Sequence, residues 1–309
     1  MDKKMIFLIS ALLAAVIITG VSFFMVKSIP GAFQEILEYD RAEPIYNEAG
    51  KYLRSGEKDK AVAAFFTVMN KYPESKYAEK SMRTMIDTHL KDGDHEKAGY
   101  YSKRLLESFP NIKDKDKIRS AIGDANIKML ISPEIQEGSI EYVIQPGDTL
   151  SAIARRFNTT VELIRKINGI QGDIIRSGQK IKIVISKFSI LADKSENILI
   201  LKKDGKQFKT YTISTGKDNS TPVGIFKIEE KMVKPVWYKV DAIISPDSKE
   251  YELGERWMGL SVEGYGIHGT SDEKTIGSQV TQGCIRMYNK DVIELFDIVP
   301  SGTEVEIVD

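Results

Sequence analysis

Cys284 is the only cysteine in the 309-residue chain, and it stands in the stretch TQGCIRM. A free thiol has a pKa of about 8.5, so a catalytic cysteine needs a neighbour that generates or stabilises its thiolate. Imidazole is the usual partner. Of the three histidines, only His268 lies in the same part of the sequence, 16 residues upstream. The cysteine count alone leaves two interpretations open, a small buried core residue or a reactive thiol.

The residues around Cys284 favour the reactive thiol. Gly283 directly precedes it, so the backbone N–H groups of Gly283 and Cys284 could face a developing oxyanion. Arg286 follows two residues later and shares a face with Cys284 if the chain is extended there. A guanidinium beside a thiol lowers the pKa of the thiol and can bind a substrate carboxylate through two hydrogen bonds. The alternative for Arg286 is a solvated or structural ion pair.

The N-terminus predicts where this chemistry takes place. Residues 5–26 carry no charged side chain, and a helix of that length spans roughly 33 Å, enough to cross a bilayer core. Lys3 and Lys4 precede the stretch, and positive charge stays cytoplasmic, so the body of the protein is expected outside the membrane. We therefore expect a single-pass membrane anchor in residues 1–28. A cleaved signal peptide and a buried soluble helix are the alternatives.

Export changes the meaning of the lone cysteine, because cysteines outside the cytoplasm are usually paired. An unpaired one is either intermolecular or reactive. Composition adds one exclusion. Lys plus Arg and Asp plus Glu balance at 44 each, which gives no support for nucleic-acid binding, since that function normally requires a basic excess.

Residues 35–131 show helical periodicity and an internal repeat. Gly56, Ala61 and Pro73 recur 37 residues later as Gly93, Ala98 and Pro110. The first unit, AGKYLRSGEKDKAVAAFFTVMNKYP, resembles a tetratricopeptide repeat, and the second unit is a weaker match. Such a helical array could bind a protein partner or hold the following domains away from the membrane, and the sequence leaves both readings open.

Residues 140–186 predict a compact strand–helix–helix–strand module. Thr149 can cap the first helix, and Asn168-Gly169 can end the second. The stretch EYVIQPGDTLSAIA and the closing SGQKIKI resemble the LysM domain. The resemblance implies binding to glycans that contain N-acetylglucosamine, such as peptidoglycan. It places the groove between two loops with the candidate residues Gly147, Asp148, Thr149, Asn168, Gly169 and Ile170. A structural module without a ligand is the alternative.

Residues 188–309 predict a mainly-β domain with one late helix. Asp204-Gly205 lies between two strand-like runs and signals a hairpin. Near the end, apolar residues recur at helical spacing, and Asp291 with Glu294 forms a candidate capping box. The expected fold is therefore multidomain α+β: a transmembrane helix, a helical repeat array, a small βααβ module and a mainly-β domain with a late helix.

The motifs of this last segment resemble the YkuD-type L,D-transpeptidase catalytic domain. They are GIHGT, TQGCIRM and, further upstream, TPVGIF. The resemblance implies that Cys284 is the nucleophile, that His268 is the general base and that the Gly269 carbonyl orients the imidazole. Thr281 matches the motif, whereas Gln282 stands where many members have a second histidine. No metal or organic cofactor is implied.

The resemblance also implies a reaction and a role in the synthesis of peptidoglycan, and so in cell-wall biogenesis and cell shape. The thiolate attacks a stem tetrapeptide, D-alanine leaves, and an amine of a neighbouring stem resolves the thioester to a 3–3 cross-link. The expected partners are stem peptides, glycan strands and the cytoplasmic membrane, with the body of the protein in the cell envelope. An L,D-carboxypeptidase that uses the same residues and a non-catalytic wall-binding scaffold are the alternatives.

Overall fold

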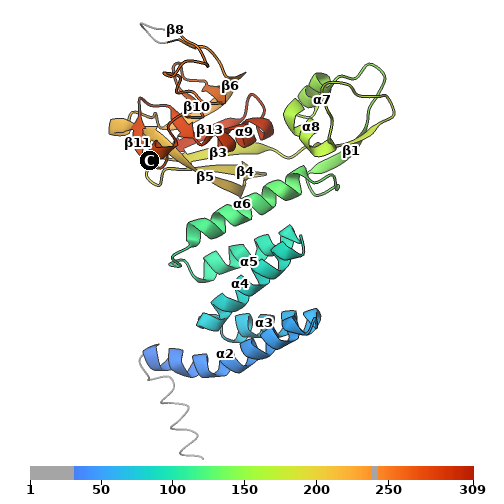
Figure 1. Ribbon diagram of the computed structural model, residues 1–309, viewed down its shortest axis with the longest axis vertical. Helices are drawn as coiled ribbons and strands as arrows, with labels where there is room; N and C mark the ends of the chain where they lie inside the picture. The colour runs from blue at the N-terminus through green and yellow to red at the C-terminus, as the bar shows by residue number, and fades with distance from the viewer. Residues whose placement is uncertain (1–30, 239–242) are drawn as a thin grey trace, which may run out of the picture. The chain divides into compact units, whose positions relative to one another are not determined.

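The computed structural model describes residues 31–238 and 243–309, and the chain divides into two compact units, Met1–Lys115 and Asp116–Asp309 (Figure 1). The predicted anchor, residues 5–26, lies outside the described residues. Among the residues that are described, no helix has the length and apolar character needed to cross a membrane.

The first unit consists of paired helices. They are α2 (Gly31–Arg54), α3 (Lys58–Lys71), α4 (Lys76–Lys91) and α5 (His95–Ser108). Gly56 and Gly93 occupy the turns inside the two pairs, with φ of 81° and 75°, a conformation that favours glycine. Ala61 and Ala98 are buried at the same place in each pair. The repeat predicted from the sequence is therefore confirmed in the backbone as well as in the core.

Helix α6 (Lys115–Ile131) falls almost entirely in the second unit. Its Asn126 side chain donates to the Phe208 carbonyl at 2.6 Å, and its Asp124 pairs with Lys209 at 2.8 Å. A Cβ on Gly123 would lie 2.6 Å from the Lys209 side chain, so glycine lets this helix approach closely. The helix was predicted as part of the repeat region, but it packs on the β-rich domain.

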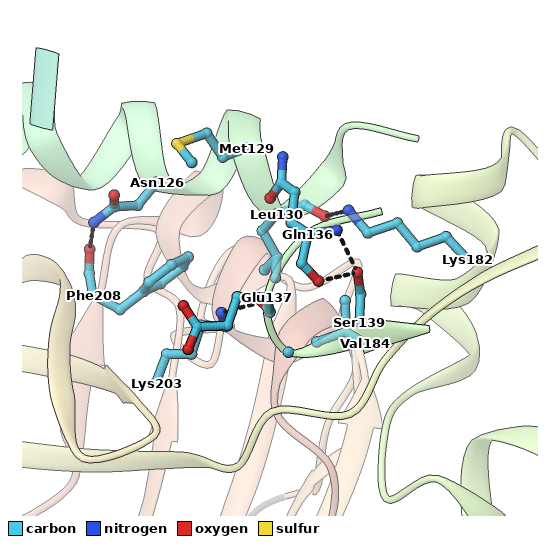
Figure 2. Close-up of a pocket in the computed structure, with 11 residues that line it drawn as sticks. Asn126, Met129, Leu130, Gln136, Glu137, Ser139, Lys182, Val184, Lys203 and Phe208 are labelled. Atoms are coloured by element: carbon cyan, nitrogen blue, oxygen red, sulfur yellow. Dashed lines mark hydrogen bonds between the residues drawn. The ribbon is translucent and has the colours of Figure 1, made fainter. Parts of the chain in front are cut away.

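A small cavity of about 60 Å³ lies beside α6 and the connection that follows it (Figure 2). The Lys182 ammonium, on a buried side chain, donates to the carbonyls of Leu130 and Ser132 at 3.4 and 2.8 Å. Lys203 donates to the Glu137 carbonyl at 3.1 Å. A space of this volume holds about two water molecules, so we assign it to the packing of the connection.

The βααβ module is present as predicted. Strands β1 (Ser139–Val143) and β2 (Lys180–Val184) pair antiparallel, and helices α7 (Leu150–Arg156) and α8 (Val161–Asn168) lie between them in the chain. The Thr149 hydroxyl accepts from the Ala152 N–H at 3.1 Å and caps α7. Gly169 ends α8 with φ of 61°. Both predicted helix signals are confirmed.

The remaining strands form a nine-stranded sheet in the order β11-β5-β12-β10-β9-β6-β13-β3-β4. Because β4 also pairs with β5, eight of these strands close on themselves. The bounds are β3 (Phe188–Asp193), β4 (Ile198–Lys203), β5 (Lys206–Gly216), β6 (Gly224–Val233), β9 (Arg256–Leu260), β10 (Gly266–His268), β11 (Gln279–Thr281), β12 (Ile285–Met287) and β13 (Glu304–Val308). A separate small ribbon consists of β7 (Trp237–Tyr238) and β8 (Ile243–Ile244). Short 3₁₀ turns span Lys217–Asn219 and Glu273–Thr275.

The late helix is α9 (Asn289–Ile298), and its apolar face is buried as expected. Asp204 and Gly205, both with positive φ, form the predicted turn between β4 and β5. The predicted capping box is wrong, because the helix begins before Asp291 and its N-cap, Tyr288, makes no side-chain cap. Glu294 is engaged elsewhere: it accepts from the Tyr211 hydroxyl at 2.8 Å and pairs with Lys209.

Candidate active site

Three neighbouring strands bring the candidate residues into one row. His268 on β10 lies opposite Trp257 on β9 and opposite Arg286 on β12. Ile267 and Ile285 point the other way into the core and are almost fully buried. Side chains alternate along a strand, so His268 and Arg286 share the opposite face of the sheet. Cys284 immediately precedes β12, next to this row.

The imidazole of His268 is held in one orientation. Its Nδ1 lies 2.6 Å from the Gly269 carbonyl oxygen. Because a carbonyl can only accept, Nδ1 carries the proton and Nε2 keeps its lone pair as the basic nitrogen. Trp257 covers the ring, with centroids 5.6 Å apart and planes tilted by 27°. Nε2 is then the nitrogen that could act as a base, and a backbone hydrogen bond with Leu253 also acts on the ring and raises the pKa of His268.

Burial lowers the pKa of His268 to about 4, and the positive charge of Arg286 acts in the same direction. Burial also raises the pKa of the Cys284 thiol, while a hydrogen bond from the Gly266 N–H and the charge of Arg286 oppose that rise. Both shifts favour the uncharged forms at neutral pH, a neutral thiol and a neutral imidazole. If Cys284 acts as a nucleophile with His268 as its base, a proton must move from sulfur to nitrogen during the attack.

The thiol itself is half-buried and unbonded to any other cysteine. Its Sγ lies 3.7 Å from the Gly264 carbonyl oxygen. The backbone around the thiol is bonded to Thr281. The Thr281 hydroxyl donates to the Cys284 carbonyl at 2.6 Å and accepts from the Gly283 N–H at 3.2 Å. One of the two backbone donors predicted for an oxyanion is thus already bonded to Thr281. Gln282, between them in the chain, is exposed.

Arg286 is held by groups at the surface. Its Nη2 donates to Glu252 at 3.2 Å, and its Nη1 lies 3.5 Å from the Thr275 hydroxyl. The arginine side chain is 13% exposed and the Glu252 side chain 49%. The buried Nε has no hydrogen-bond partner. An exposed carboxylate is a weak partner, so the guanidinium is well placed to exchange it for the carboxylate of a ligand.

Asn289 supports the turn after His268 and was not predicted from the sequence. Its Oδ1 accepts from the Glu255 N–H at 3.0 Å, and its Nδ2 donates to the Thr270 carbonyl at 2.7 Å. A Cβ on Gly269 would lie 2.2 Å from that Oδ1. Only glycine fits there, which explains the residue after the histidine. Nothing local in the sequence marks Asn289, because its partners lie 19 and 34 positions away.

The second candidate site lies in the βααβ module. A groove of about 510 Å³ is lined by Asn168, Gly169, Ile170, Gln171, Ile174, Arg176, Ser177 and Gln179. Three predicted glycan residues, Asn168, Gly169 and Ile170, are among them. Ile174 is 82% exposed, so the groove offers an apolar surface together with amide and guanidinium donors.

The other predicted glycan residues face inward or sit at the helix start. Asp148 accepts from the Tyr142 hydroxyl at 2.6 Å and from the Gln145 N–H at 2.8 Å, and its side chain is only 7% exposed. Thr149 caps α7. Gly147 adopts φ of 86° in the turn before them. Even Asn168 exchanges hydrogen bonds with the Lys182 backbone on β2, so the motif residues largely build the fold.

Comparison with known proteins matches three regions of the chain. A model of the L,D-transpeptidase catalytic domain matches residues 187–307, and a LysM model matches residues 142–184. A model described as an outer membrane lipoprotein matches residues 39–161. The resemblances stated from the sequence are confirmed by these matches.

Individual proteins similar to this chain are also named as L,D-transpeptidases. A putative L,D-transpeptidase YkuD of Bacillus licheniformis is 36% identical over 174 residues, which cover 54% of this chain and 97% of the relative. A putative L,D-transpeptidase YqjB of Bacillus subtilis is 39% identical over 39% of this chain and 70% of the relative.

Among solved structures, an L,D-transpeptidase of Mycobacterium tuberculosis matches with a TM-score of 0.36 and 16% identity, over 43% of this chain and 63% of that one. That likeness is too low to carry an argument. The near-complete coverage of the Bacillus licheniformis relative, together with the histidine–cysteine–arginine row on one sheet face, leads to one conclusion: the chain belongs to the YkuD family of L,D-transpeptidases.

Proposed function

We propose that the protein is a peptidoglycan L,D-transpeptidase that works through a Cys284 thioester and forms 3–3 cross-links. The observation that carries the proposal is the row of His268 and Arg286 beside Cys284, with Nδ1 of His268 fixed on the Gly269 carbonyl. This arrangement supplies a nucleophile, a correctly oriented base and a cation, as acyl transfer by a cysteine requires.

In the first half-reaction, the Cys284 sulfur bonds to the carbonyl carbon of the third stem residue while Nε2 of His268 takes the thiol proton. The resulting oxyanion collapses, the peptide bond to D-alanine breaks, and His268 returns the proton to the leaving amine. The product is a thioester and free D-alanine. Because the resting pair is neutral, the base works during the attack and no thiolate needs to be stored beforehand.

In the second half-reaction, the side-chain amine of a neighbouring stem attacks the thioester. His268 takes a proton from that amine and gives it to the departing sulfur, which restores the thiol. If water enters in place of the amine, the same residues release a tripeptide, and the enzyme acts as an L,D-carboxypeptidase. In either case Arg286 would bind a stem carboxylate in exchange for Glu252.

The module with the 510 Å³ groove would bind glycan and keep the catalytic domain near its substrate, which raises the effective concentration of stem peptides. Residues 5–26 would anchor the chain in the cytoplasmic membrane with its body in the envelope, and the helical repeats would contact a protein partner or act as a spacer. No metal, organic cofactor or nucleic acid is part of the proposal.

The test compares wild type and Cys284→Ala on purified muropeptides. Wild type is expected to release D-alanine and to produce 3–3 dimers, and the variant to produce neither while still binding glycan in a pull-down. Tripeptide monomers without dimers would instead identify a carboxypeptidase. A wild-type protein that gains no covalent mass on Cys284 after incubation with a carbapenem would argue for a non-catalytic scaffold.

A further inference from the structure

Thr221 reaches the catalytic loop from a distant part of the chain. It lies 62 positions before Gly283, in the stretch TPVGIF, and it is 1% exposed. Its hydroxyl donates to the Gly283 carbonyl at 2.8 Å and accepts from the Gly216 N–H at 2.7 Å. The single proton of the hydroxyl and one of its lone pairs are therefore both assigned.

The two peptide groups next to Cys284 are each bonded to a threonine. Thr221 holds the carbonyl of Gly283, and Thr281 holds the carbonyl of Cys284. Thr281 also accepts from the Gly283 N–H at 3.2 Å. Of the two N–H groups that the sequence analysis nominated for an oxyanion, only that of Cys284 is not bonded to this pair of hydroxyls.

The bond from Thr221 determines the direction of the Cys284 N–H. The carbonyl of Gly283 and the N–H of Cys284 belong to the same peptide group, and no peptide bond of the described residues is cis. In a planar trans peptide these two groups point in opposite directions. A hydroxyl that fixes the Gly283 oxygen therefore also fixes the N–H, on the side away from Thr221.

The Gly283–Cys284 peptide lies in a closely packed part of the structure. Gly283 has φ of 131°, and a Cβ on it would lie 2.5 Å from the Tyr265 ring. A Cβ on Gly216 would lie 2.9 Å from the Gly283 Cα. The peptide therefore lies against the Tyr265 ring and the Gly216 backbone, and the Thr221 hydroxyl is the side-chain group that bonds its carbonyl.

We propose that Thr221 is a positioning residue that directs the Cys284 N–H at the oxyanion formed when the Cys284 sulfur attacks a carbonyl. The inference rests on the proposed acyl-transfer function and adds the residue that organises its oxyanion site. Thr221 does not touch substrate, and it acts only through the Gly283–Cys284 peptide. A donor that is fixed in advance costs no reorganisation when negative charge develops.

The test uses two reactions of the same thiol. Acylation by a carbapenem passes through an oxyanion, whereas alkylation by iodoacetamide is a displacement of iodide that forms none. Thr221→Val removes the hydroxyl at nearly constant volume, and Thr221→Ser keeps the hydroxyl and serves as the matched control. Thr221→Ala takes the place of the valine variant if that protein does not fold.

We expect Thr221→Val to slow carbapenem acylation about 10- to 100-fold, less than the roughly 10²- to 10³-fold cost of removing an oxyanion donor outright, because the Cys284 N–H is still present. The alkylation rate should stay within about twofold. Thr221→Ser should acylate at nearly the wild-type rate. An equal fall in both rates, or no fall in either, would overturn the inference. Wild type that alkylates at Cys284 yet gives no acyl adduct would instead overturn the proposed function, and the inference with it.

Discussion

The two sides of the active site are built differently. On the thiol side, two buried threonine hydroxyls, 1% and 5% exposed, fix the peptides around Cys284. On the other side, Arg286 is paired with a glutamate whose side chain is 49% exposed. The first set of bonds is protected from water and the second competes with it.

This difference teaches which atoms the fold keeps fixed and which it leaves exchangeable. The groups proposed to act in the reaction, His268 and the Cys284 peptide, are held by hydrogen bonds before substrate arrives. The cation that would bind a charged part of the substrate is held by a replaceable partner. Reacting groups gain from being organised in advance, whereas a binding group must release its resting contact.

The largest effect is expected when His268, the proposed base, is replaced. His268→Gln keeps a polar side chain of similar size but cannot take the thiol proton, so we expect kcat/KM to fall roughly 10³-fold, within the range for general bases. Steady-state release of D-alanine measures this. Activity within tenfold of wild type would mean that another group deprotonates Cys284.

The same substitution also tests whether burial lowers the pKa of His268. Its folded pKa of about 4 lies below the ordinary value of 6.5, so the unfolded chain binds more protons between these pH values. The wild type is therefore expected to lose roughly 3 kcal/mol of stability from this group as the pH falls from about 6.5 to about 4. His268→Gln lacks this loss.

Urea unfolding of both proteins at a series of pH values measures the effect as a difference in the free energy of unfolding. The shared carboxylates cancel in that difference. If the difference between wild type and His268→Gln stayed constant with pH, the imidazole would be titrating normally and the buried, neutral state described above would be wrong.

On the exchangeable side, Arg286→Lys keeps the charge but loses the planar fork. We expect KM for a stem peptide to rise about tenfold, because one charge-assisted hydrogen bond is lost. A peptide with its carboxylates amidated should show no such rise. If both peptides respond equally, Arg286 supports the site and does not bind a carboxylate.

The smallest effect is expected for Glu252→Gln. Removing the resting carboxylate frees Arg286, and because exposed ion pairs are worth about 0–1 kcal/mol, KM should fall by no more than about fivefold. Initial rates at low substrate concentration are the measurement. A higher KM in this variant would show that Glu252 helps to hold the substrate and does not compete with it.

Local signals in the sequence predicted much of this molecule. The cap at Thr149, the turn at Asp204-Gly205 and the repeated glycines all depend on a few adjacent residues, and the structure has them. The capping box failed because Glu294 bonds to Lys209 and Tyr211, which lie far away in the sequence. A local pattern cannot reveal a competing partner that folding brings in.

Some residues of the candidate site could be predicted from the sequence and others could not. Cys284, His268 and Arg286 could be nominated from residue type, spacing and family resemblance, and their roles stay predictions until the variants are measured. Asn289 could not be found, and Thr221 was seen only as part of the TPVGIF motif without a role, since the bonds that give each its role reach segments 19 to 62 positions away. The sequence shows which groups could react, whereas their supports appear only after the strands are assembled.

In the second unit, helix α6, the βααβ module and the closed sheet share one hydrophobic core. One continuous apolar cluster includes residues of α6, of α8 and of the closed sheet, among them Ile127, Leu130, Leu163, Ile167, Phe188 and Leu201. A genetic exchange that replaced the glycan module alone would therefore cut through this cluster and expose it. The helix, the module and the enzyme domain are therefore expected to unfold as one cooperative unit, which differential scanning calorimetry of residues 116–309 would show as a single transition.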